Sequence, residues 1–463
     1  MAGIGFRLEK ILSKNSYTNL LEGYAYAAMV SAGPLLCTIF SIALLSWVAN
    51  DRVSSLDVMI FRTLVVYIYG VSLVTSSPAQ MIITRYMADK IFLKDYKALV
   101  PSFVGMTILS MILHAIIGFV GILYLDLDFG TEIMAIVLFV NIGILWIAMI
   151  VLSAAKEFHR LFISFLIGAS ISVLAGRFLC SDYGLMGLIS GFTMGQVVLV
   201  ILLVLQIFTE FDYRMRVEWY FISYFKRFAS LAFIATFYNI GVWGDKFVFW
   251  FTPETNEKVH NFLHASYVYD TPVFLAYLFI VPSLAMFTVR IETSFYIHYQ
   301  KYFLSILNKH PYFAIEERRK NIIKDLQLSL GRLLVLQGTI TMVGLGLSPV
   351  IYDYLSMSAV NLGVFQIAIL ATFLQALLQT LLIIILYFDF RTDALIMSLI
   401  FAVTNIVFAR LSIYLGFSWY GYGYFGSCLI SLLMGFVIFN YRIKHLLFYT
   451  FVNQKIIVHK QTS

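Results

Sequence analysis

The stretch TEIMAIVLFVNIGILWIAMIVLSA, residues 131–154, decides the fold class of this chain. It carries one charge, Glu132, and is long enough to cross the hydrocarbon core of a bilayer, which takes about 20 helical residues. The whole chain has a similarly apolar composition: 61% of its 463 residues are hydrophobic and only 12% are charged. Soluble domains carry about 25% charged residues, and disordered chains are poor in apolar ones. We therefore expect an all-α polytopic membrane protein.

Apolar runs bounded by charges or turn residues predict about twelve transmembrane helices. The predicted spans are approximately 24–49, 59–83, 99–125, 131–154, 161–179, 184–208, 229–252, 271–289, 333–354, 363–387, 393–415 and 421–441. The weakest prediction is 161–179, which is short and contains Arg177.

The distribution of basic residues predicts the orientation of these spans. With both termini in the cytoplasm, the inner segments hold 26 of the 32 Lys and Arg residues, and the net charge is +12 inside and −5 outside. The positive-inside rule favours this topology. Because orientation accounts for the net charge of +7, we expect no nucleic-acid partner.

Polar gaps divide the chain into six spans on each side. The predicted organisation is a cytoplasmic amphipathic helix at 1–23, an N-terminal lobe at 24–208, a cytoplasmic linker at 209–228, a C-terminal lobe at 229–441 with a basic cytoplasmic insertion at 289–332, and a cytoplasmic tail at 442–463. The insertion carries eight cations, which favour contact with anionic lipid or docking of a cytoplasmic partner.

The common catalytic motifs are absent from the sequence. It contains no Gly-x-x-x-x-Gly-Lys-Ser/Thr phosphate loop, no Gly-x-Ser-x-Gly elbow and no His-Glu-x-x-His zinc pair. Cys37, Cys180 and Cys428 have no metal-ligand spacing. Asp126 and Asp128 form an Asp-x-Asp pair, but in an outward loop, where a solvated acidic turn is the better interpretation. We expect a protein that is not an enzyme and that has no cofactor or metal.

Charged residues inside the predicted span 229–252 are the first candidates for function. Asp245 and Lys246 are costly in a membrane, where such residues usually face the bundle interior or water. Helical spacing places Asn239, Trp243, Lys246 and Trp250 on one face. Aromatic rings beside hydrogen-bonding groups suit a sugar. An interfacial aromatic belt with a structural ion pair explains the pattern equally well. Both charges lie toward the outer end of the span, from which Lys246 could also snorkel outward.

Three more cations lie in the outer third of predicted spans, namely Arg62, Arg177 and Arg410. With Lys246 they predict a cationic outward vestibule, and snorkelling to lipid headgroups is the alternative.

Helix-breaking residues at membrane depth are candidate hinges. They are Gly33, Pro34, Pro78 and Pro282. Ser76, Gln80 and Thr84 form an uncharged polar stripe beside Pro78, for which we expect helix-to-helix hydrogen bonds.

Several sequence blocks resemble the PelG family over most of the chain. The blocks are MAGIGF at 1–6, YAYAAMVSAGP at 24–34, YNIGVWGDKFVFW at 238–250, TPVFLAYLFIVP at 271–282 and VRIETSF at 289–295. The third block, with its Gly-x-Trp-x-Asp-Lys core, and the Arg290-Ile-Glu292 motif of the last block are together fairly specific.

The resemblance implies a fold of two six-helix lobes around a central cavity, as in the flippase and multidrug-exporter superfamily. It implies export of the Pel exopolysaccharide, an N-acetylhexosamine-containing biofilm polymer, across the bacterial inner membrane. The implied partners are a cytoplasmic glycosyltransferase using UDP-sugars and membrane subunits that include a cyclic di-GMP receptor. We expect Trp243, Asp245, Lys246, Arg290 and Glu292 to matter for export.

Other functions stay open at this stage. One is an ion-coupled drug or lipid-linked-oligosaccharide flippase of the same fold, and another is a non-transporting scaffold. For a polymer exporter, polymerisation at the cytoplasmic mouth and alternating access of the two lobes are both candidate mechanisms.

Overall fold

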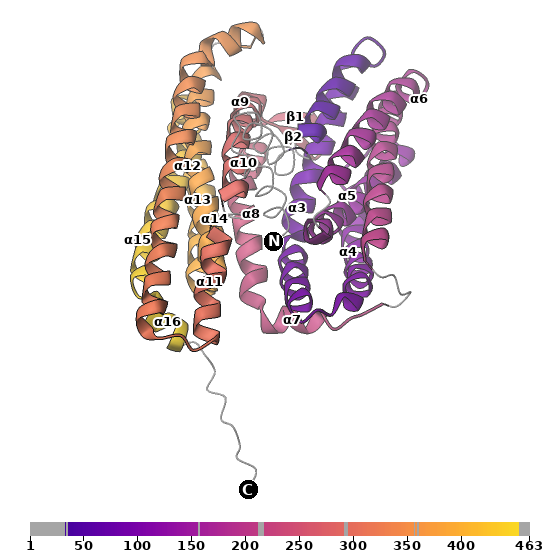
Figure 1. Ribbon diagram of the computed structural model, residues 1–463. Helices are drawn as coiled ribbons and strands as arrows, with labels where there is room; N and C mark the ends of the chain where they lie inside the picture. The colour runs from indigo at the N-terminus through magenta and orange to yellow at the C-terminus, as the bar shows by residue number, and fades with distance from the viewer. Residues whose placement is uncertain are drawn as a thin grey trace, which may run out of the picture.

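The computed structural model describes Gly33 and residues 36–155, 158–211, 217–290, 295–355, 357–358 and 361–452. This part of the chain is almost entirely helical (Figure 1). Within it, nine helices are long and apolar enough to cross a membrane. A helix satisfies its backbone hydrogen bonds internally, which a hydrocarbon environment requires. The predicted all-α membrane fold is confirmed.

The helices fall into two groups that follow each other along the chain. The first group comprises Leu36–Ala49, α3 (Ser55–Phe92), η1 (Tyr96–Ala98), α4 (Leu99–Ile122), α5 (Phe129–Ala155) and α6 (Phe158–Glu210). The second comprises α7 (Ile222–Arg227), α8 (Ala229–Phe251), α9 (Tyr267–Tyr277), η2 (Leu278–Ile280), α10 (Val281–Arg290), α11 (Tyr296–Leu307), α12 (Tyr312–Tyr354), α13 (Leu362–Tyr387), α14 (Arg391–Leu415), η5 (Phe417–Trp419), α15 (Tyr422–Lys444) and α16 (Leu446–Val452). Strands β1 (Glu257–His260) and β2 (Leu263–Ala265) form an antiparallel hairpin between α8 and α9.

α6 is a helical hairpin rather than one rod. Its 53 residues would extend about 80 Å, roughly twice the thickness of a bilayer. At Gly184 the backbone is non-helical, with φ +54°, a conformation that glycine adopts without strain. The two halves then run back along each other so closely that a Cβ on Gly191 would lie 2.2 Å from the Cα of Gly176. The two predicted spans 161–179 and 184–208 are these two halves.

Each group packs mainly within itself, which makes two lobes. In the first lobe, α5 packs against α3, α4 and α6, and in the second, α14 and α15 pack with α8 and α13. The lobes meet where α3 lies along α8. Figure 1 shows the first lobe on the right, α8 to α10 in the centre and α11 to α16 on the left. About twelve helices in two lobes agree with the sequence-based expectation.

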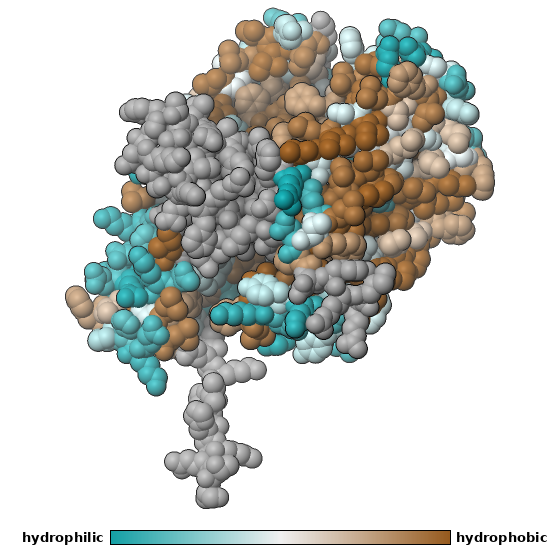
Figure 2. All heavy atoms as spheres, turned by 45° about the vertical axis from the view of Figure 1, so that its right-hand side comes forward, coloured by the Kyte–Doolittle hydropathy of each residue, from teal (hydrophilic) through white to brown (hydrophobic). Residues whose placement is uncertain are grey.

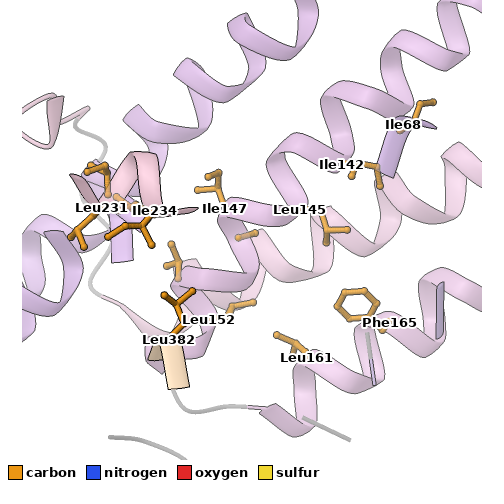
Figure 3. Close-up of a cluster of buried hydrophobic side chains, with 14 of the residues drawn as sticks. Ile68, Ile142, Leu145, Ile147, Leu152, Leu161, Phe165, Leu231, Ile234 and Leu382 are labelled. Atoms are coloured by element: carbon orange, nitrogen blue, oxygen red, sulfur yellow. The ribbon is translucent and has the colours of Figure 1, made fainter. Parts of the chain in front are cut away.

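Apolar packing joins the lobes and also covers the outside. Figure 3 shows buried aliphatic and aromatic side chains from several helices converging, among them Ile68 of α3, Ile147 of α5, Leu231 of α8 and Leu382 of α13. On the outer face, Figure 2 shows a broad apolar surface with polar residues gathered toward its two ends. This distribution is typical of a lipid-facing surface.

The predicted basic insertion is largely helical, as the amphipathic spacing of Ile322, Ile323 and Leu326 indicates. Residues 296–307 form α11, and α12 runs without interruption from Tyr312 through the predicted span 333–354. Arg319 forms an ion pair with Glu316 at 2.6 Å and donates to the carbonyl oxygen of Lys444 at 3.2 Å. The linker contains α7, and the tail begins with the end of α15 and α16. The predicted helix at 1–23 lies outside the described residues, and the lobe boundaries remain predictions.

Candidate functional site

Asp245 and Lys246 are adjacent in α8 and fully buried, with 0% and 1% of their surface exposed. Lys246 Nζ donates to both Asp245 carboxylate oxygens at 3.1 Å, and to the Val242 carbonyl oxygen one turn earlier at 2.9 Å. The ammonium lies 5.1 Å from the ring centres of Tyr277 and Tyr424, within cation–π range. Lys246 does not reach the surface, so it does not snorkel outward, whereas the structural ion pair of the alternative interpretation is present.

Side chains from two other helices hold the Asp245 carboxylate. Asn405 of α14 donates through Nδ2 to Oδ1 at 3.1 Å and to the Gly241 carbonyl oxygen at 2.6 Å. Tyr269 of α9 donates its hydroxyl to Oδ2. Ser427 of α15 donates to the Asn405 side-chain oxygen at 3.4 Å. Both carboxylate oxygens are therefore satisfied, as a buried charge requires.

The aromatic side of this network extends across the second lobe. Lys246 donates to the Tyr277 hydroxyl at 3.4 Å, and the hydroxyls of Tyr277 and Tyr424 lie 3.0 Å apart. Tyr424 donates in turn to Gln375 of α13. The ion pair thus connects α8, α9, α13, α14 and α15 inside one lobe. It is a neutral, saturated centre with no free charge to offer a substrate.

The two tryptophans of the predicted α8 face point toward the other lobe. A Cβ on Gly70 of α3 would lie 2.8 Å from ring atoms of Trp243, so the helices are in close contact there. The Trp250 ring stacks on Tyr67 of α3, with ring centres 4.4 Å apart and planes at 14°. Trp250 also donates its indole N–H to Asp270 Oδ2 at 2.8 Å. Both tryptophans serve the contact between the lobes.

Asn239, the first residue of that face, lines a cavity of about 230 Å³ between the lobes. The lining residues come from α3, α5, α8 and α13; they are Ser77, Gln80, Met81, Thr84, Ile150, Ile234, Ala235, Tyr238, Asn239, Gln379, Leu382, Ile383 and Leu386. Six of these residues have hydrogen-bonding side chains, seven are apolar, and none is charged. The cavity suits a neutral polar ligand better than an ion.

The polar stripe of α3 belongs to this cavity. Gln80 donates to Ser76 Oγ at 2.7 Å, and Thr84 donates to the Gln80 carbonyl oxygen at 2.7 Å. These bonds stay within α3, and among the described residues the predicted helix-to-helix bonds of this stripe are not found. Gln80 and Thr84 line the cavity, whereas Ser76 is buried beside it.

The predicted cationic vestibule is not a single cluster around Lys246. Arg62 is exposed on α3, and Arg177 is half-buried in α6. Arg410 is exposed at the end of α14, where it donates to Thr252 at 3.1 Å and lies 3.8 Å from Glu254. Lys246 has its partners inside the lobe, so its role differs from that of the three arginines. Whether the arginines serve a vestibule stays a prediction.

The candidate motif around Arg290 lies at the edge of the described chain. Arg290 ends α10. Its side chain and the whole of Glu292 fall outside the described residues.

The candidate hinges differ in their local structure. α3 continues through Pro78, and Ser77 Oγ donates at 2.7 Å to the Val74 carbonyl oxygen, which Pro78 leaves without its usual N–H donor. Pro282 is the second residue of α10, directly after the 3₁₀ turn η2, a position that tolerates proline. Gly33 is helical and buried, and Pro34 lies outside the described residues. Their function as hinges stays a prediction.

Sequence reasoning missed Asp270 and Tyr67. Asp270 is 8% exposed and lies in the first turn of α9, one residue before the predicted span. A lone acid in the aromatic run Tyr267-Val-Tyr-Asp270 was the available signal. Nothing in the sequence of α3 marks Tyr67, since its partner follows about 180 residues later. Across the described ranges, no group of three His, Cys, Asp or Glu residues is placed to hold a metal.

Several solved structures share the fold of this chain. A multidrug-resistance MATE family transporter of the MOP superfamily, in an outward-facing conformation, is 12% identical with a TM-score of 0.62, covering 91% of this chain and 96% of that one. A MOP superfamily transporter from Pyrococcus furiosus, whose binding pocket is described as having reversed polarity, has the same identity and coverage and a TM-score of 0.63. The MATE transporter ClbM in complex with Rb⁺ is 11% identical with a TM-score of 0.59, covering 89% and 93%. These likenesses show that the chain shares the fold of these structures.

The sequence itself identifies the family of this chain. The PelG family, described as "Putative exopolysaccharide Exporter (EPS-E)", matches residues 1–451. The chain belongs to the PelG family, as its sequence blocks indicated. Among curated proteins no significant match to the chain is found.

Proposed function

We propose that this transporter exports the Pel exopolysaccharide, a polymer containing N-acetylhexosamine, across the bacterial inner membrane. The observation that carries the proposal is the uncharged cavity between the lobes, lined by both polar and apolar side chains, in a chain of the PelG family. Hydroxyl and amide groups beside Tyr238 match the polar edges and apolar C–H faces of a sugar ring. Family membership supports an exopolysaccharide as the substrate. The experiment below tests whether this exopolysaccharide is Pel.

The same cavity argues against the ion-coupled drug flippase. A cation or cationic drug requires an acidic group in its path. The cavity-lining residues carry none, and Asp245 is neutralised by Lys246 inside the second lobe. The volume of about 230 Å³ is below the range of about 300–1,000 Å³ that holds a drug-sized ligand, so neither a drug nor a polymer passes in this closed arrangement. The lobes must separate before a polymer passes.

The proposed setting follows from the charge distribution and the family. Both termini lie in the cytoplasm, where a UDP-sugar-dependent glycosyltransferase delivers the growing polymer. Membrane subunits, one of them a cyclic di-GMP receptor, complete the complex. The basic surface of α11 and α12 lies on the predicted cytoplasmic side, and Lys320 and Lys324 are exposed there for anionic lipid or a partner.

The test compares a strain lacking this chain with its complemented partner. Secreted and intracellular hexosamine polymer are measured together, and sensitivity to several cationic drugs is measured in parallel. We expect the deletion to abolish secreted polymer and leave drug sensitivity unchanged. Unchanged secretion together with raised drug sensitivity would contradict the proposal.

A further control distinguishes an exporter from a scaffold that only assembles the synthase complex. Variants with a filled cavity should lose secretion while the complex still co-purifies with the chain. If secretion follows only the assembly of the complex, the chain is a scaffold.

A further inference from the structure

The β-hairpin between α8 and α9 connects the two lobes on the predicted outer side. Its turn residue Asn261 donates through Nδ2 to Asp126 Oδ2 at 2.8 Å, and His260 Nε2 lies 3.0 Å from the Asp126 carbonyl oxygen. Asp126 belongs to the turn between α4 and α5 in the first lobe. Next to it, the rings of Tyr124 and Phe262 lie 5.8 Å apart. Asp126 and Asp128 are exposed, as predicted for a solvated acidic turn, and Asp126 also holds the hairpin.

The base of the hairpin is joined to the first lobe as well. Tyr67 of α3 donates its hydroxyl to the His264 carbonyl oxygen at 2.8 Å. The same tyrosine ring stacks on Trp250, which Asp270 holds through the indole N–H. Asp270 also accepts from the Ser266 backbone N–H, at the end of the hairpin, at 3.0 Å. Hairpin, stacked rings and α9 thus form one connected contact.

This contact lies on the outer side of the cavity. Tyr67 precedes the cavity residues Ser77 to Thr84 on α3 by ten or more residues, which is about 15 Å of helix. Trp250 lies at the outer end of α8, whereas Ile234 to Asn239 of the same helix line the cavity. A polymer that leaves the cavity outward therefore meets the stacked rings and then the hairpin.

We propose that the hairpin Glu257–Ala265, with Tyr67 and Trp250, is the outer gate of the export path. In the closed state Asn261 and His260 hold Asp126. Opening breaks these bonds and parts the two rings, so that the second lobe moves away from α3. This inference rests on the proposed export function.

The contacts of the proposed gate are of two kinds, exposed hydrogen bonds and buried stacked rings. Asp126 and Asn261 are exposed, so water replaces their hydrogen bond at little cost when the lobes part. The stacked rings of Tyr67 and Trp250 are buried and exclude water while the gate is closed. The buried rings therefore keep the gate tight when it is shut, and the exposed hydrogen bonds around Asp126 are the part that is released at little cost.

A reversible cross-link tests the gate. In a chain with Cys37, Cys180 and Cys428 replaced by alanine, Tyr124→Cys and Phe262→Cys are joined by a short bis-thiosulfonate reagent that a thiol reductant cleaves. We expect cross-linking to lower polymer secretion at least tenfold and the reductant to restore it. Undiminished secretion by chains shown to be cross-linked would overturn the gate, while export by uncross-linked cells keeps the proposed function intact.

A matched control uses a pair on the same outer side but within the first lobe. Arg52 donates to Ser181 at 2.7 Å, and both residues are exposed. Cross-linking Arg52→Cys to Ser181→Cys should leave secretion unchanged. If this pair blocks secretion equally, the effect does not come from opening of the lobes, and the gate is rejected.

A second measurement does not depend on export. A single cysteine at Gln80→Cys reports whether the cavity is accessible to a membrane-impermeant thiol reagent added outside intact cells. Combining it with Asp126→Ala and Asn261→Ala should raise the labelling rate of this cysteine severalfold over its rate in a chain that keeps Asp126 and Asn261. An unchanged rate would show that these residues do not keep the outer side closed.

Discussion

The buried ion pair of Asp245 and Lys246 illustrates how a membrane interior keeps charge. An isolated charge at depth is costly, but here the two charges neutralise each other and every polar atom has a partner. Such a pair often contributes little net stability, whereas removing one partner leaves the other charge buried alone. The two residues are therefore tightly coupled.

We predict that this coupling appears in a double-mutant cycle. Asp245→Leu or Lys246→Met alone should lower the free energy of unfolding by about 3–5 kcal/mol, because each leaves an unpaired buried charge. The double variant should be more stable than either single variant. Thermal unfolding in detergent and the amount of chain in the membrane measure the effect, with polymer secretion recorded alongside. Additive losses would mean that the two side chains act independently.

At this scale the sequence predicts the pair but not its partners. Two adjacent charges in an apolar run indicate a satisfied interior site or a functional one. Asn405 and Tyr424 join the site from helices that follow more than 150 residues later, and no local pattern brings them there. Asp270 was missed because a boundary error of one residue placed it outside the membrane.

Two glycines determine the shape of α6. Gly184 provides the positive φ that turns α6 back on itself, and Gly191 lets the two halves touch at Gly176. The sequence predicts two separate spans here and misses how closely they pack, since periodicity along a helix does not show which residues face a neighbour. Pro78 of α3 is a second example. The sequence predicts a break there, but the helix continues because Ser77 donates to the carbonyl oxygen that Pro78 leaves without a donor.

Filling the α6 contact should destabilise the hairpin. A methyl group on Gly191 would lie 2.2 Å from the Cα of Gly176, so Gly191→Ala should cost about 1–3 kcal/mol. Gly338→Ala on α12 is the matched control, because nothing lies within 4 Å of its added Cβ and alanine favours a helix by about 1 kcal/mol. Unfolding temperatures that fall equally in both variants would refute the close contact.

The Ser77 hydroxyl should matter more than an ordinary helix serine. Ser77→Ala leaves the Val74 carbonyl oxygen without a donor, at a cost of about 1–3 kcal/mol. Ser153 donates to the Ile150 carbonyl oxygen in a helix without a nearby proline, so Ser153→Ala should be near neutral. The difference in unfolding temperature between the two variants measures the repair, and equal values would argue against it.

The whole molecule places an uncharged cavity and a closed outer contact along one line between the lobes. Composition and charge alone predict the polytopic fold, its orientation and the division into six spans on each side. They do not predict the cavity, because it is built from four helices of two lobes. Only residues that were already unusual in a membrane, such as Asn239 and Gln80, gave a sign of it.

Blocking the cavity should stop export without unfolding the protein. Gln80→Trp adds bulk to a space of about 230 Å³ and should lower polymer secretion at least tenfold, with an unchanged unfolding temperature. Leu113→Trp, at an exposed position of α4, is the control and should secrete normally. Normal secretion by Gln80→Trp would exclude this cavity from the path.

The uninterrupted α12 has a mechanical consequence. At 1.5 Å per residue its 43 residues extend about 64 Å, of which roughly 30 Å precede the predicted span. A rod of that length acts as a lever, so a tilt of about 10° at the bilayer surface displaces its basic tip by about 5 Å. Because Arg319 ties that tip to the end of α15, the displacement carries a second helix with it. Small rotations of the C-terminal lobe thus become large movements at the surface where a synthase would dock.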